Sequence, residues 1–110
     1  MGAVPDLTVA SPRGSITISR DVVAETAARC YGVVGLGTRS KVGRLLRRDG
    51  ITIGGDASGM RIGLRVVVEY GLNLTEVAST VRSQVAYDVE RLTGLPVEAV
   101  EVVVEDVRVS

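Results

Sequence analysis

The sequence predicts an α+β protein, a two-layer sandwich in which two helices pack on one face of a mixed sheet of three to five strands. Three observations predict this class. Residues 60–70 alternate apolar and polar side chains, as a half-buried strand does. Residues 74–92 repeat apolar side chains at intervals of three and four, as one face of a helix does. The chain is rich in valine, which favours sheet, and its only aromatic residues are three tyrosines.

The length of 110 residues is typical of one domain. Residues 1–13 contain two prolines and no hydrophobic periodicity, so we expect a flexible N-terminal tail there. The single domain is then expected over residues 14–110.

The first half of this domain starts with a short strand over residues 14–18. Ser19 is a helix N-cap, and Asp21 places a negative charge in the first turn, where it suits the helix dipole. Gly32 is expected to end this helix. Cys30 lies on its apolar face, which indicates a small buried hydrophobe and not a nucleophile. Residues 33–38 are either a strand or an extended connection.

The second half is expected to begin with a strand over residues 50–53 and a turn over residues 54–59, which lead into the strand at 60–70 as a hairpin. Asn73 and Glu76 have the spacing of a capping box at the start of the long helix. Residues 93–96 stop that helix, and a last strand follows over residues 97–106. The apolar side chains of the helix that we expect to face the sheet are Leu74, Val77, Ala78, Val81, Val85, Val89 and Leu92.

Tyr70 and Tyr87 have two interpretations. They can pack together near the junction of the long strand and the long helix, or Tyr87 can be an exposed contact. We expect structural packing for both.

The net charge of the chain is zero, but the two halves differ. Residues 1–50 hold eight basic and four acidic side chains, or +4, and residues 51–110 hold five basic and nine acidic, or −4. Such halves can steer head-to-tail association between copies. The alternative, which we favour from the sequence alone, is that the charges attract each other within one molecule or are solvated.

Two charged segments are candidate interaction surfaces. The basic segment, residues 39–48, carries Arg39, Lys41, Arg44, Arg47 and Arg48. It could bind anionic lipid, nucleic acid or an acidic protein surface, or it could be a solvated segment whose leucines dock on the core. The exposed row of the last strand is acidic and includes Glu101 and Glu105.

The inventory of reactive side chains is small. The chain has no histidine and one cysteine, which argues against histidine catalysis, a disulfide and a thiolate zinc site. The spacing of Gly32, Gly35 and Gly37 fits neither the dinucleotide fingerprint nor the P-loop. We therefore predict no enzyme, no catalytic or metal-binding residues, no cofactor and no small-molecule substrate. No signal peptide or membrane span is apparent, so we expect a cytoplasmic protein.

Several segments follow one another in a characteristic order: Gly14–Ser19, Val22–Ala27, Val68–Ala78, Val81–Val85, Val89–Leu95 and Val100–Val104. Together they cover about residues 14–109. Their order and spacing resemble the alkaline shock proteins, a bacterial family of cell-envelope stress response proteins. Tyr31 departs from the pattern, because the family usually has proline before this Gly-Val turn.

The resemblance implies a non-enzymatic protein of envelope homeostasis. Members of the family can gather at the inner face of the cell membrane through a small membrane-anchored partner and can self-associate. The family has no established catalytic residues to carry over. Our leading hypothesis is therefore an envelope stress response protein that acts by protein–protein interaction and self-association. The alternative is a small RNA-binding module that uses residues 39–48, although that segment carries no aromatic side chain on which bases could stack.

Overall fold

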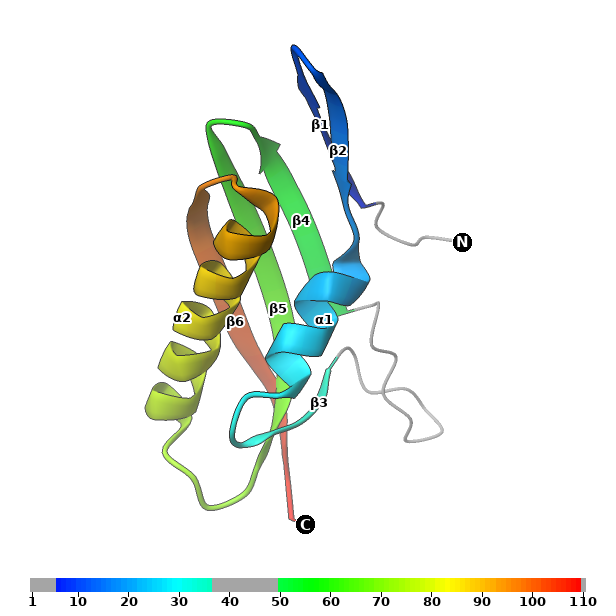
Figure 1. The fold of residues 1–110 in the computed structure, drawn as a ribbon. Helices are drawn as coiled ribbons and strands as arrows, with labels where there is room; N and C mark the ends of the chain where they lie inside the picture. Colours follow the sequence, from blue (N-terminus) through cyan, green and yellow to red (C-terminus); the bar gives the residue numbers. More distant parts are fainter. Residues whose placement is uncertain (1–5, 37–49, 110) are drawn as a thin grey trace.

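The structure, a computed structural model, describes residues 6–36 and 50–109. It confirms the predicted α+β class: Figure 1 shows both helices on the same face of the main sheet. In chain order the elements are β1 (Leu7–Ser11), β2 (Gly14–Ile18), α1 (Arg20–Ala28), β3 (Val33–Leu36), β4 (Ile51–Asp56), β5 (Gly59–Glu69), α2 (Leu74–Thr93) and β6 (Val97–Arg108).

Strand β5 is the centre of the main, four-stranded sheet. Strand β6 pairs with it in parallel along its length, from Met60↔Val97 to Glu69↔Arg108. Strand β4 pairs antiparallel with the first half of β5, and β3 pairs antiparallel with residues 66–68. Because a strand has two edges and β6 takes one of them, β4 and β3 share the other edge in succession.

The core lies between this sheet and the two helices. The apolar side chains of the alternating pattern in β5 are all at most 2% exposed: Met60, Ile62, Leu64, Val66 and Val68. They belong to the same apolar cluster as Val77, Val81, Val85 and Val89 of α2. Alternation in the strand and helical spacing in α2 therefore predict the centre of the core correctly.

The two ends of α2 differ from the prediction. Leu74 is 40% exposed and Leu92 is 64% exposed, although helical spacing places both on the face of the buried valines. Both leucines lie in the terminal turns, so the ends of the helix are not covered as its middle is. The helix termini themselves form as expected: the Asn73 side chain accepts a hydrogen bond from the Glu76 N–H at 3.1 Å, and Gly94 takes the left-handed conformation after the last turn.

The N-terminal segment corrects the prediction of a flexible tail through residue 13. Residues 7–11 form β1, which pairs antiparallel with β2 from Leu7↔Ile18 to Ser11↔Gly14. Figure 1 shows this hairpin projecting past the end of β4. The hairpin is tied to α1 at its base, because Asp6 Oδ1 accepts a hydrogen bond from the Arg20 N–H at 2.9 Å and lies 3.6 Å from Arg20 Nε.

One helix and one turn are shorter than predicted. Helix α1 is capped by Ser19 as expected, with the Asp21 N–H donating to its hydroxyl at 3.1 Å, but it ends at Ala28, before Gly32. The hairpin between β4 and β5 has only residues 57 and 58 outside its strands, since Asp56 pairs with Gly59. Residues 33–36 form a strand, which decides between the two interpretations of that segment.

Candidate interaction surface

The basic segment lies outside the described residues. The binding role of its five cations therefore remains a prediction from the sequence; they are Arg39, Lys41, Arg44, Arg47 and Arg48. The acidic candidates on β6, Glu101 and Glu105, lie within the described residues, and their surroundings differ.

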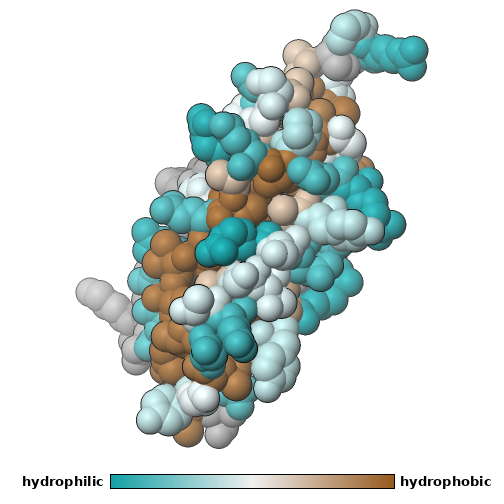
Figure 2. Space-filling view, turned by 90° about the vertical axis from the view of Figure 1, so that its left-hand side faces the viewer, coloured by the Kyte–Doolittle hydropathy of each residue, from teal (hydrophilic) through white to brown (hydrophobic). Residues whose placement is uncertain are grey.

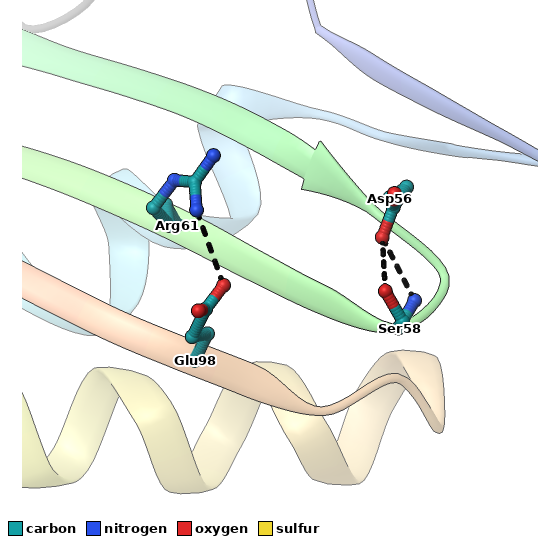
Figure 3. A network of polar contacts seen from close by, with 4 residues as sticks. All are labelled: Asp56, Ser58, Arg61 and Glu98. Carbon is teal, nitrogen blue, oxygen red and sulfur yellow. Dashed lines mark hydrogen bonds and ion pairs between the residues drawn. The ribbon is translucent and has the colours of Figure 1, made fainter.

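Glu101 and Glu105 have different surroundings. Glu101 is exposed on the outer face of the sheet, away from the helices. Glu105 is half-buried, and its Oε1 accepts a hydrogen bond from Arg65 Nη1 at 3.0 Å. Glu98, at the start of β6, pairs in the same way with Arg61 at 3.3 Å (Figure 3). Of these three carboxylates on β6, Glu101 is the one that forms no ion pair with an arginine of β5.

The positions of Glu98 and Glu105 explain their partners. The register between β5 and β6 shifts between Met60 and Arg61 and again between Val66 and Val67, and the residues of β6 that the pairing skips are Glu98 and Glu105. Both are therefore β-bulge residues, a type of irregularity that is common at sheet edges. The regular stretch of β6 between the two bulges is residues 99–104.

The outer face of the sheet is hollowed. A cavity of about 480 Å³ lies over β4, β5 and β6, and small side chains form much of its floor; it is lined by Thr52, Ile53, Gly54, Arg61, Ile62, Gly63, Ala99 and Glu101. A Cβ at Gly63 would lie 2.6 Å from Thr52 Oγ1. The glycine thus leaves room for the threonine side chain across the strand.

The side of the molecule that carries α2 and β6 is apolar along part of its length. Figure 2, which looks onto this side, shows a band of apolar surface bordered by hydrophilic groups. Within β6, Val103 is 44% exposed and Val107 is 37% exposed. Among the described residues, β6 pairs with β5 alone, so one of its edges carries no strand. Neither charge nor composition pointed to this edge in the sequence.

All three tyrosines of the chain are exposed, and this corrects the expected packing of Tyr70 and Tyr87. The exposed fractions are 75% for Tyr31, 69% for Tyr70 and 61% for Tyr87. Tyr87 has the Arg91 guanidinium 6.0 Å from its ring centre. Because valine and isoleucine fill the core, the aromatic side chains remain at the surface, where tyrosine is a common anchor of protein–protein contacts.

Cys30 is buried as expected. Its Sγ contacts the Thr26 carbonyl oxygen at 3.5 Å, and burial, followed by the charge of Asp88, raises the pKa of the thiol above 9.0. The thiol borders a groove of about 320 Å³ between α1 and α2, whose wall also includes Tyr31 and Gln84. Within residues 6–36 and 50–109, no three side chains of the types His, Cys, Asp and Glu group as metal ligands would.

The tight turn after β4 is held by Asp56. Its Oδ1 accepts hydrogen bonds from the Ser58 hydroxyl at 2.6 Å and from the Ser58 N–H at 3.0 Å (Figure 3). The hydroxyl bond, followed by the backbone bond, lowers the pKa of the Asp56 carboxyl. This fully exposed arrangement fixes the turn, and we assign it a structural role.

The family model that matches residues 8–109 is that of the alkaline shock protein 23 family, which is described as having a cell envelope-related function. An uncharacterized protein of Bacillus subtilis (strain 168), YloU, is 31% identical over 109 residues, covering 88% of this chain and 91% of YloU. An uncharacterized protein of Streptococcus pyogenes serotype M6, Spy1614, is 28% identical over 108 residues, covering 87% and 89%. No solved structure matches the chain. None of the described helices is both long and apolar enough to span a membrane.

Proposed function

Because the chain belongs to the alkaline shock protein family, whose function is related to the cell envelope, we propose that it serves the envelope by binding other proteins and further copies of itself, and not by catalysis. A membrane-anchored protein is the proposed partner, and the site of action is the inner face of the membrane. This family membership confirms the resemblance on which the leading hypothesis was based.

The exposure of the tyrosines is the observation that carries the binding role. A chain with no phenylalanine and no tryptophan keeps each of its three aromatic side chains at least 61% exposed. In a protein of this size, an aromatic ring is the largest apolar group available for burial, so leaving all three at the surface forgoes core stability. Such rings are the side chains that most often anchor a protein–protein interface.

The composition supports the non-catalytic part of the proposal. The chain has no histidine, and its only cysteine is buried with a raised pKa, which opposes the thiolate form that a nucleophile needs. The RNA-binding alternative depends on residues 39–48, and none of the described surfaces adds a reason to prefer it.

Crosslinking in living cells, followed by capture of the tagged full chain, tests the proposal. We expect a membrane protein and further copies of the chain among the captured molecules. Tyr87→Ala should reduce this capture, while Arg82→Ala, an exposed change on the same helix, should not. Recovery of nucleic acid alone, or a yield of crosslinked protein no greater than from an unrelated tagged protein, would overturn it.

A further inference from the structure

Among the described strands, only β5 is paired along both edges, so each other strand has an edge without a partner strand. Two of these edges lie on opposite sides of the molecule. One is β6, which pairs with β5 alone among the described residues. The other is β2, which within residues 6–36 and 50–109 pairs with β1 alone, while β1 is the strand of the hairpin that lies close to β4. Figure 1 shows β6 and the hairpin at opposite flanks of the sheet. Each edge presents backbone N–H and C=O groups that another strand can pair with.

Although Val9 and Ile18 anchor the hairpin to the domain, its outer strand β2 is little covered by the described residues. A two-stranded sheet is marginally stable in water on its own, and a third strand or a packed face normally completes it. Four of the five residues of β2 are exposed. Among them is Ile16, which is 42% exposed although it pairs across the hairpin with the buried Val9. A further strand beside β2 would cover this isoleucine.

The edge of β6 has one stretch suited to receive a strand. Bulges at Glu98 and Glu105 interrupt its regular pairing toward each end. Such bulges are common in edge strands, where they prevent unwanted pairing with other chains. Between them, residues 99–104 are regular and include the exposed Val103. This stretch of six residues is close in length to the five residues of β2.

Charge favours pairing between the two unlike edges. Residues 7–18 contain Arg13 and no acidic side chain, so the hairpin carries +1. Strand β6 contains four acidic side chains and Arg108, or −3 in sum. Because Glu98 and Glu105 are paired with arginines of β5, the charge that residues 99–104 present is that of Glu101. Pairing β6 with a second β6 would bring two acidic strands together, which is unfavourable for opposing side chains. Pairing β6 with the hairpin joins opposite charges.

We propose that the β1–β2 hairpin of one copy adds through β2 to the edge of β6, at residues 99–104, of a second copy. This inference rests on the self-association in the proposed function and supplies its interface. Because the two surfaces differ and lie on opposite flanks, the contact is heterologous, and repeating it extends the assembly head to tail instead of closing a two-fold dimer. The contact covers both Ile16 and Val103.

Mixed crosslinking between two single-cysteine variants tests the pairing. In a Cys30→Ala background, Ile16→Cys and Val103→Cys are each purified as full chains and treated with a short bis-maleimide, separately and mixed. We expect a covalent dimer in the mixture and little in either variant alone, with a ladder of higher species when both changes are in one chain. A dimer of Val103→Cys alone in equal yield would show a two-fold β6 contact and overturn the proposal, as would no dimer in any sample.

A matched pair of charge variants tests the same contact without crosslinking. Val103→Lys places a charge on the proposed edge, while Val109→Lys makes the same change at a valine that is 81% exposed and follows β6. Sedimentation should show at least a tenfold weaker association for Val103→Lys and less than a twofold change for Val109→Lys. Circular dichroism confirms that both remain folded. Equal association of the two variants would overturn the proposed interface, whereas capture of a membrane protein from cells would still support the proposed function.

Discussion

Arg65 on β5 and Glu105 on β6 form an ion pair, with Nη1 3.0 Å from Oε1, and Glu105 is a residue that the pairing of the two strands skips. The same relationship joins Arg61 to Glu98 at the first bulge. Each extra residue of β6 thus places a carboxylate beside an arginine of the neighbouring strand. The acidic row that the sequence suggests as an interaction surface is therefore partly engaged inside the domain.

We expect the Arg65–Glu105 pair to contribute a small coupling free energy of about 0.2–1 kcal/mol, because the two side chains are 52% and 26% exposed. Urea unfolding of Arg65→Gln, Glu105→Gln and the double variant gives this value from a double-mutant cycle. Glu101→Gln, which changes an exposed carboxylate on the same strand, should leave the free energy of unfolding unchanged. A coupling of zero in low salt would show that the bulge does not depend on the ion pair.

The middle and the end of α2 should respond differently to the same substitution. Val81→Asp places a carboxylate where the native side chain is fully buried, and the loss of stability should be on the order of 4–5 kcal/mol or more, enough to unfold a marginal domain. Leu92→Asp, on the same helical face but 64% exposed, should change the free energy of unfolding by less than about 1 kcal/mol. Thermal melts followed by circular dichroism compare the two. Equal destabilisation would mean that the last turn of α2 is covered in solution.

The contrast between Val81 and Leu92 shows which buried side chains sequence periodicity can predict and which it cannot. Alternation in β5 and helical spacing in α2 depend on local geometry, so they predict which side chains face inward. These patterns do not show where the sheet that faces α2 ends. For this reason the sequence placed Leu74 and Leu92 in the core. The hairpin was missed for a related reason: Pro12 indicated a tail, whereas it lies in the turn between two strands that are stabilised by pairing.

The interaction surfaces were predicted less completely than the fold. Charge identified Glu101 and Glu105, but the bulge that gives Glu105 an internal partner depends on register, which a sequence pattern does not specify. Tyr70 and Tyr87 were expected to pack because aromatic rings usually do. The only available signal of their exposure was the scarcity of aromatics in a core that valine could fill.

Gly55 and Gly54, adjacent residues before the tight turn, provide a test of backbone strain. Gly55 has φ of +103°, and a Cβ there would contact the Gly59 carbonyl oxygen across the hairpin. Gly55→Ala should therefore destabilise the domain by about 1–3 kcal/mol. A Cβ at Gly54 meets no atom within 4 Å, and φ there is not in the left-handed region, so Gly54→Ala should be neutral or stabilising by up to about 1 kcal/mol. Chemical denaturation measures both, and equal effects would contradict the assigned turn geometry.

The buried thiol of Cys30 should make stability depend on alkaline pH. Burial raises the pKa of the thiol in the folded chain above 9.0, and the charge of Asp88 adds to the shift, so the folded state holds the proton more tightly than the unfolded state does. Its contribution to stability is complete below the pKa of the unfolded thiol and is lost as the pH rises through that of the folded thiol. The free energy of unfolding of the native chain should therefore fall more steeply above pH 9.0 than that of Cys30→Ala.

Comparing these two proteins isolates the thiol, because every other ionisable side chain is present in both. Urea unfolding at a series of pH values measures the difference. A second measurement uses the thiol directly: its reaction with a disulfide reagent at pH 8 should be much slower in the folded chain than in urea, since the thiolate is the reacting species and burial suppresses it. Equal rates in the two conditions would show that the groove between α1 and α2 opens readily, and would contradict the burial of Cys30.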